Sequence, residues 1–292
     1  MAQEGQVRSV LKELSERVCR ELTLSVARVS AIVFVLLLAC LISLLSISGV
    51  AEQVPVRHMQ GLLHGFLVLR DINGNILASG DVSQTASGTR VTNELVFHFK
   101  DGSLHREITV FSQRQRFQLL KYHLVQKGKA FKRSMDMTVD AWTGKVKVVS
   151  LDDKSKEELF EEQLTLPSDL ANGMIGMLLG DIATGQRETI LSMLVATPKP
   201  RVVKLVVRPE GEDTFLVDAL PRKATRYAMK IVIGGVAGAV APIAGKQPPD
   251  THAWIIGGRS PAVLKTEGPL CEGGPVWRIE LASPVWPTGR QR

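Results

Sequence analysis

The sequence predicts a mainly β protein with one or two helices, in which an N-terminal transmembrane helix is followed by a curved antiparallel sheet or half-barrel. Three observations favour this fold class: an uncharged apolar segment near the N-terminus, a long series of alternating segments joined by turn residues, and one helical interruption. Apolar residues are 45% and charged residues 22% of the chain, which excludes wholesale disorder. Three cysteines exclude a disulfide-rich scaffold and a four-cysteine metal cage.

The clearest signal is the segment 29–51, which contains no charged residue between Arg28 and Glu52. A membrane-spanning helix needs about 20 apolar residues, and a helix satisfies its own backbone groups inside lipid. Lys and Arg are frequent before this segment and sparse just after it, so the positive-inside rule places residues 1–28 in the cytoplasm and residues 52–292 outside. The alternative, a buried core helix, is rarely apolar on every side over this length.

The leader 1–28 has apolar residues at helical spacing and is predicted to be a short amphipathic cytoplasmic helix, unless translation starts later. Two processing alternatives stay open. Residues 37–40 resemble a lipobox in which Cys40 would be lipidated, although the apolar run continues past it. Residues 49–51 have a small-x-small pattern that suits cleavage after Ala51 and export. The favoured prediction is an uncleaved anchor in a bacterial inner membrane, with a periplasmic C-terminal domain.

Residues from about 61 to 151 predict an up-and-down antiparallel meander of six or seven strands. Tight-turn signals separate its alternating segments at residues 73–74, 101–102 and 143–144, each ending in glycine. Alternation with a period of two is typical of strands that bury one face. This part of the chain is therefore expected to form a sheet with an apolar concave face.

A helical stretch is predicted to interrupt the strands. It begins with the charged residues 154–166, and a helix start signal at 166–169 then precedes the apolar positions of a core-facing helix. Alternating segments return from about residue 188 to the C-terminus. Within the external region 52–292, a domain boundary near residue 155 and a single shared core are equally compatible with this pattern.

Several short motifs resemble a group of uncharacterised exported bacterial proteins. A Leu-Pro-x-Asp helix start is followed by strands of the form Arg-x-Ala-x-Arg-Tyr and Trp-x-x-x-Gly-x-x-Pro. In architecture, residues 61–287 are similar to the half-open β-barrels of periplasmic lipoprotein carriers and of DUF3108 proteins. The resemblance implies a sheet wrapped around an apolar cavity and no named activity. It is carried by Leu166, Pro167, Asp169, Arg222, Ala224, Arg226, Tyr227, Trp254, Pro261 and residues 273–281.

The predicted binding site is the concave face of the sheet together with tryptophans at its mouth. Ligand pockets are mainly apolar with few polar groups, and a lipid or another apolar small molecule would suit this one. The alternative is that the same side chains simply pack the core. The candidate lining residues are Leu95, Phe97, Phe99, Ile108, Trp254 and Trp277.

A candidate metal site depends on the turn at Asp101 and Gly102. If these two residues form the whole hairpin loop, His98 lies opposite His105 on the outer face, together with Glu107. Cross-strand neighbours are about 5 Å apart, so two imidazoles and a carboxylate could hold zinc with an open fourth position. The alternative is a solvated face without a metal.

Other chemical motifs are missing from the sequence. Residues 234–250 lack the spacing of a phosphate loop or a dinucleotide fingerprint, and no Gly-x-Ser-x-Gly nucleophile motif occurs. The uncharged run 231–245 is too short to span a membrane and is either a mobile apolar lip or a turn packed on the core. The external region is mildly basic without interleaved aromatics, so no nucleic-acid partner and no cofactor are predicted.

Three functional hypotheses follow. The favoured one is a membrane-anchored envelope protein that binds a lipid or other apolar ligand without catalysis. The second is a protein-interaction module with a packed sheet and partners, not identifiable from the sequence, recruited through sheet edges or the leader. The third is a hydrolase or a metal-dependent enzyme. An empty concavity favours the first hypothesis, a filled core the second, and a bound zinc the third.

Overall fold

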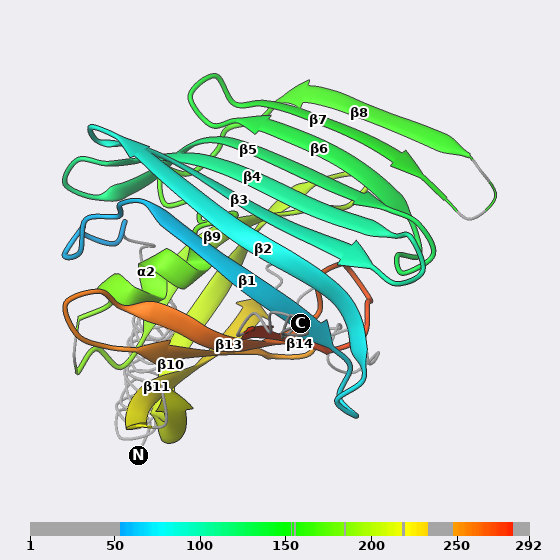
Figure 1. Ribbon diagram of the computed structural model, residues 1–292. Coiled ribbons are helices and arrows are strands. Elements are labelled where there is room, and N and C mark those ends of the chain that lie inside the picture. The colour runs from blue at the N-terminus through cyan, green and yellow to red at the C-terminus, as the bar shows by residue number, and fades with distance from the viewer. Residues whose placement is uncertain are drawn as a thin grey trace, which may run out of the picture. The chain divides into compact units, whose positions relative to one another are not determined.

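The computed structural model in Figure 1 describes residues 53–152, 154, 156–183, 185–217, 220–232 and 248–282. The chain divides into two units, 1–50 and 51–292, and all the described residues belong to the second. The predicted leader and span lie outside these residues, as does most of the run 231–245. Among the residues that are described, no helix combines the length and hydropathy needed to cross a membrane.

The described residues form one antiparallel sheet of 14 strands, in the order β8-β7-β6-β5-β4-β3-β2-β1-β14-β13-β12-β11-β10-β9. Each strand therefore pairs with its sequence neighbours, except that β1 pairs with β14 and so joins two meanders. The first meander contains β1 Leu63–Arg70, β2 Ile76–Ser87, β3 Arg90–Phe99, β4 Leu104–Gln113, β5 Phe117–Lys127, β6 Ser134–Asp140, β7 Lys145–Leu151 and β8 Glu157–Gln163. The second contains β9 Thr189–Val195, β10 Arg201–Val217, β11 Leu220–Val232, β12 Thr251–Ile256, β13 Ala262–Gly268 and β14 Trp277–Leu281.

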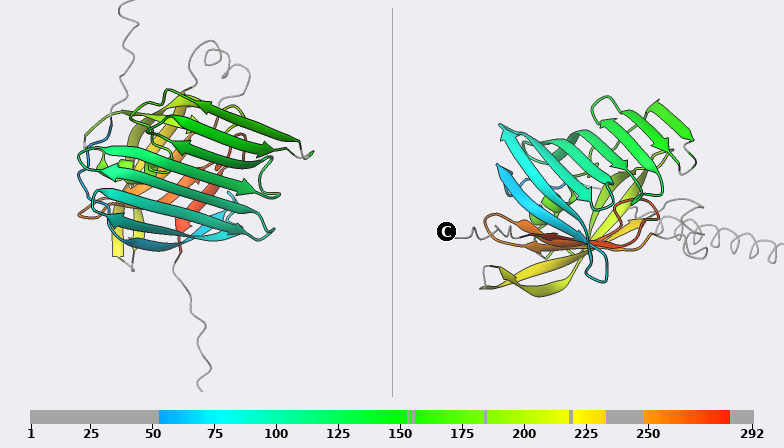
Figure 2. Two further views of the ribbon diagram at one scale, coloured as in Figure 1. Left: turned by 90° about the horizontal axis from the view of Figure 1, so that it is seen from above. Right: turned by 45° about the vertical axis from the view of Figure 1, so that its right-hand side comes forward.

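The sheet curves so that the two meanders face each other, with the short helix α2 (Ile175–Asp181) against the second one (Figures 1 and 2). The prediction of a mainly β chain with a curved antiparallel sheet is therefore confirmed. Two local predictions are wrong. Residues 157–163, expected to be helical, form strand β8, because their alternate residues pair along β7. The helix expected from residue 167 begins only at Ile175, after turns at 168–169 and 172–174.

One hydrophobic core spans residues on both sides of position 155. It contains Phe111 and Met137 from the first meander, Leu178 from α2, and Leu205 and Ile255 from the second meander, all buried. The segment from residue 170 to 182 thus lies inside the curve of the sheet and fills it. The sequence left open a domain boundary near residue 155 or a single shared core, and the described residues on both sides of this position share one core.

The interior segment also covers one edge of the sheet. Leu170 forms a parallel bridge to Ser192 of β9. The side chain of Asn172 then continues the pairing: its Nδ2 donates to the carbonyl of Leu194 and its Oδ1 accepts from the N–H of Leu194, each at 2.8 Å. An uncovered edge offers unpaired backbone groups to other strands. The edge of β9 is therefore closed, whereas β8, at the other end of the described sheet, pairs with β7 alone.

We predict that Asn172→Ala destabilises the fold by about 3 kcal/mol, because it leaves a buried N–H and a buried carbonyl of Leu194 without partners. Urea unfolding followed by tryptophan fluorescence measures the change. Asn73→Ala, in an exposed turn, is the matched control and is expected to cost less than about 0.5 kcal/mol. Equal stability of the two variants would show that Asn172 does not hold this edge.

Candidate functional site

The hairpin between β3 and β4 decides whether the predicted histidine pair exists. Its loop runs from Lys100 to Gly102: the N–H of Phe99 donates to the carbonyl of Ser103 at 2.9 Å, and Gly102 has φ 84°. Glycine adopts this left-handed conformation without steric cost. The loop is one residue longer than the two-residue turn that the sequence suggested, so every pair in the hairpin is shifted by one.

A shift of one residue moves a side chain to the other face of a sheet. His98 lies opposite Leu104 and is exposed, whereas His105 lies opposite Phe97 and is buried on the inner face, where Glu107 is half-buried. The predicted zinc site of His98, His105 and Glu107 is therefore wrong. Within the part of the chain that the structure describes, no group of three or more His, Cys, Asp or Glu side chains could hold a metal ion.

The predicted apolar lining is a packed aromatic cluster. Phe97, Phe99 and Trp277 are buried and lie together with Phe131, which the sequence did not single out. The ring of Phe99 is 5.5 Å from that of Phe131 and 5.4 Å from that of Trp277, centroid to centroid, and Leu95 packs against the cluster. Aromatic rings at such distances are in contact. These side chains thus fill the face that was expected to be hollow.

Two of the predicted lining residues lie on the outer face instead. Ile108 pairs with Glu94, and alternation places it opposite to the buried His105. Trp254 lies between Ala253 and Ile255, which face the core. Its indole Nε1 donates to Asp213 Oδ2 at 2.6 Å, and the Nζ of Lys265 lies 3.8 Å from its ring centroid. Trp254 and Trp277 therefore do not meet at one mouth.

The buried imidazole of His105 is held by a glutamine. Nε2 of Gln126 lies 3.1 Å from Nδ1 of His105 and donates to the carbonyl of Leu270 at 2.7 Å. Burial lowers the pKa of His105 to about 4. Its Nε2 has no hydrogen-bond partner in the described structure. His105 is therefore a neutral core histidine beside Phe97 and Phe131.

A buried acid and phenol lie further along the inner face. The hydroxyl of Tyr122 donates to Oε1 of Glu107 at 2.5 Å. Burial raises the pKa of Glu107, and burial together with the neighbouring carboxyl raises the pKa of Tyr122. Gly173, with φ 67°, packs so closely here that a Cβ atom would overlap Oγ1 of Thr109. The pair thus lies under the interior segment, and the sequence could have indicated it only with the correct register.

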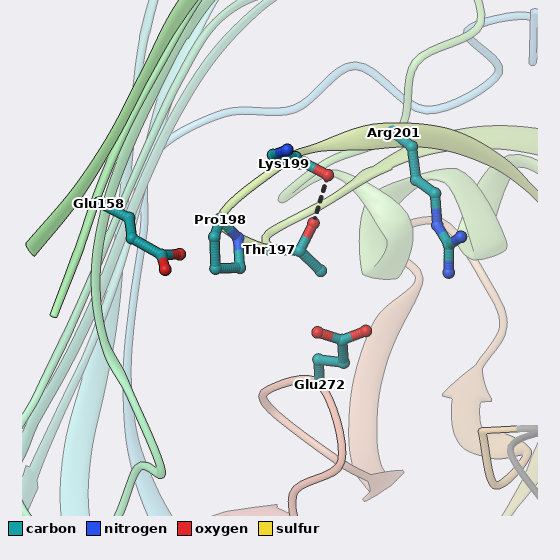
Figure 3. A pocket seen from close by; sticks show the side chains of 6 residues that line it. All are labelled: Glu158, Thr197, Pro198, Lys199, Arg201 and Glu272. Atoms are coloured by element: carbon teal, nitrogen blue, oxygen red, sulfur yellow. Dashed lines mark hydrogen bonds between the residues drawn. The ribbon is translucent and has the colours of Figure 1, made fainter. Parts of the chain in front are cut away.

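A surface pocket of about 370 Å³ lies where β8 approaches the β9–β10 turn and the β13–β14 loop (Figure 3). The carboxyls of Glu158 and Glu272 and the guanidinium of Arg201 surround it, and the hydroxyl of Thr197 donates to the carbonyl of Lys199 at 2.7 Å. Oε2 of Glu158 is also 3.4 Å from Arg133. The walls of this pocket carry both signs of charge, unlike the apolar lining predicted from the sequence.

No family model matches the chain, and no curated protein matches it. The fold is similar to a crystal structure described as a beta-barrel-like protein of the domain of unknown function DUF1849 from Brucella abortus. The TM-score is 0.41 and the identity 14%, over 81% of this chain and 100% of that chain. A similarity at this level carries no argument about function. The finer resemblance to DUF3108 proteins and lipoprotein carriers stays a prediction.

We predict that His105 makes the fold weaker in acid. The pKa of His105 is about 4 in the folded chain, below the ordinary 6.5. Between pH 6.5 and pH 4, His105 is therefore protonated in the unfolded chain but neutral in the folded chain. The stability that depends on neutral His105 is complete above pH 6.5 and falls as the pH approaches 4, by about 3 kcal/mol in total.

Urea unfolding of the natural chain and of His105→Leu between pH 7 and pH 4 measures how much of the loss of stability in acid comes from His105. The raised pKa of Glu107 acts in the opposite direction but is common to both chains, so the difference isolates His105. The natural chain should lose more stability than the variant on acidification. Parallel pH curves would contradict the buried neutral histidine.

Proposed function

We propose that this chain is a single-pass, membrane-anchored protein of the bacterial envelope, and that its external β domain is a non-catalytic protein-interaction module. We infer that an extended segment of a partner adds to the free edge of β8. The observation that carries the proposal is the contrast between the two ends of the sheet: β9 is covered by residues 170–172, and β8 pairs with β7 alone in the described structure. Anchoring rests on the apolar segment 29–51.

The backbone groups that β8 offers can be identified from the two ends of its hairpin with β7. The N–H of Asp152 donates to the carbonyl of Lys156 at 3.1 Å, and the N–H of Leu164 donates to the carbonyl of Gly144 at 2.8 Å. In this register the even-numbered residues of β8 bond to β7. The N–H and carbonyl groups of Leu159 and Glu161 therefore point away from β7, where a partner strand could bind them.

The side chains of β8 indicate the charge of that partner. Four of its seven residues are glutamates, and Leu159 is 62% exposed between them. Glu161 is paired with Lys145 at 2.8 Å on the outer face. Charged side chains on an edge discourage indiscriminate pairing, while opposite charges on neighbouring strands stabilise it. On the outer face, Glu157 and Glu161 flank Leu159, so a partner segment with Lys or Arg four positions apart and an apolar residue midway between them fits this edge.

The predicted carriage of a lipid has less support. The residues expected to line the ligand site are packed against one another or lie on the outer face, and the interior segment fills the core. A packed core with one open edge is the arrangement expected for an interaction module. The proposal therefore follows the second of the three hypotheses for the external domain and retains the membrane anchor of the first.

Peptides selected from a random library against the full chain in detergent test the strand-addition model. They should contain basic residues four positions apart with an apolar residue midway between them. Leu159→Pro removes an N–H that points away from β7, which an edge strand tolerates, and should weaken their binding by about tenfold. Leu159→Ala is the matched control, because it keeps the N–H, and should bind nearly as well as the natural chain. Equal affinities for both variants, with unchanged folding, would refute binding at β8.

Alkaline carbonate extraction of cells that express the full chain tests the anchor. The chain should stay in the membrane pellet, and protease added to spheroplasts should cleave the external domain while sparing a tag before residue 1. Release of the chain by carbonate would show that residues 29–51 do not span the membrane or are removed.

A further inference from the structure

The first described residues form a strap across one end of the barrel-like domain. The carbonyl of Val54 accepts from the N–H of Phe117 at 3.0 Å, and the N–H of Val56 donates to the carbonyl of Gln115 at 2.9 Å. Val54 is buried in the core. The strap 53–61 is therefore fixed to the β4–β5 turn from its first residues.

The same strap reaches the C-terminal end of α2. Oδ1 of Asp181, the last residue of α2, accepts from the N–H of His58 at 2.7 Å and also from the N–H of Arg57. Further on, the amide side chain of Gln113 bonds to the N–H and the carbonyl of Gln60, at 2.6 and 2.9 Å. The position of residues 53–60 relative to the domain is thus set by hydrogen bonds rather than by a loose linker.

Several loops gather at this end of the domain. The β2–β3 turn adjoins the β4–β5 turn, because the N–H of Gln113 donates to the carbonyl of Thr89 at 2.8 Å. The β12–β13 loop adjoins α2, where Pro261 packs close to Gly180. The tip of the β10–β11 hairpin extends past that loop, since Ala224 pairs with Ile256. Figures 1 and 2 place these loops and the start of β1 at one end of the sheet.

Arginines lie in or directly beside several loops of this end. Each of the five is exposed, and in the described structure none of them forms an ion pair or a side-chain hydrogen bond. Two carboxylates of the described residues nearby have partners: Asp181 accepts from N–H groups of the strap, and Glu188 pairs with Arg208. Among the described residues, the loops of this end therefore carry an excess of positive charge. The five residues are Arg57, Arg90, Arg114, Arg187 and Arg259.

Exposed aliphatic side chains lie among these arginines. Leu62, which directly follows the strap, is 86% exposed, and Met59 within the strap is 62% exposed. At the tip of the β10–β11 hairpin, Leu216 is 78% and Leu220 56% exposed. Large aliphatic side chains on loop tips beside cationic residues are the composition of surfaces that lie at a membrane interface.

We propose that this arginine-and-leucine end docks onto anionic lipid headgroups. The inference rests on the anchor of the proposed function: the predicted span ends at residue 51 and the strap is fixed from Gln53, so at most about 7 Å of chain can separate them. If residues 29–51 span the membrane, a connection this short keeps the strap end of the domain close to the bilayer. Anionic headgroups attract Lys and Arg within a Debye length of the surface, and Leu62 and Leu216 then reach the acyl boundary.

The test uses the full chain in lipid nanodiscs, with Cys19, Cys40 and Cys271 replaced by alanine. A donor dye is placed by Thr89→Cys in the β2–β3 turn of the arginine-and-leucine end, or by Asn73→Cys in the β1–β2 turn at the other end of the domain as control. An acceptor dye labels the headgroups. Energy transfer from position 89 should be about twofold higher in discs that contain phosphatidylglycerol than in phosphatidylcholine alone, and should fall in ~0.5 M salt. Position 73 should show no such dependence.

A charge variant completes the test. Replacing the five arginines by glutamine should abolish the phosphatidylglycerol dependence at position 89. The control replaces four lysines of the opposite end by glutamine, namely Lys100, Lys127, Lys129 and Lys154, and should leave the dependence intact. A chain that fails to enter the discs would overturn the anchor and the docking with it. A chain that enters them, but with energy transfer from position 89 unaffected by lipid charge or by the arginine variant, would overturn docking alone.

Discussion

The filling of the curved sheet by its own interior segment is the constraint on which the structure depends. A sheet that curls on itself must exclude water from its concave face, and protein interiors are close-packed. Residues 170–182 meet this requirement with Leu170, Met174, Leu178 and Leu179, all buried. The fit is close, since Gly173 leaves no room for a side chain against Thr109. The apolar surface that this segment covers is thereby used for folding.

The path of that segment also decides which surfaces stay available. On its way into the core it pairs with β9 through Leu170 and Asn172, and after α2 it receives the strap on Asp181. One sheet edge and one barrel end are thus organised by the same residues. Within the described residues, nothing pairs with the outer edge of β8, which the segment does not reach. Partner binding at β8 and lipid contact at the strap end are therefore independent proposals about different surfaces.

The sequence predicted the larger pattern because period-two alternation and glycine turns are local signals. The errors lie where a local signal fits two loop lengths that differ by one residue, or fits both a helix and a strand. Asp101-Gly102 is compatible with loops of two and of three residues, and the longer loop moved His105 into the core and Ile108 out of it. The glutamates of 157–162 suit a helix face as well as an edge strand, and only pairing with β7 decides. Trp254 lies on the outer face but is buried beside Asp213 and Lys265, and the alternation of apolar and polar residues does not indicate this burial.

Hydrogen–deuterium exchange of the full chain, read at single residues, tests the unequal edges most directly. The amides of Ser192 and Leu194 on β9 should exchange slowly, because their outer neighbours Asp169 and Asn172 accept them. The amides of Leu159 and Glu161 on β8 should exchange orders of magnitude faster, while that of Phe160 is protected by β7. Equal protection of the odd and even residues of β8, without an added partner, would contradict a free edge and the interaction module built on it.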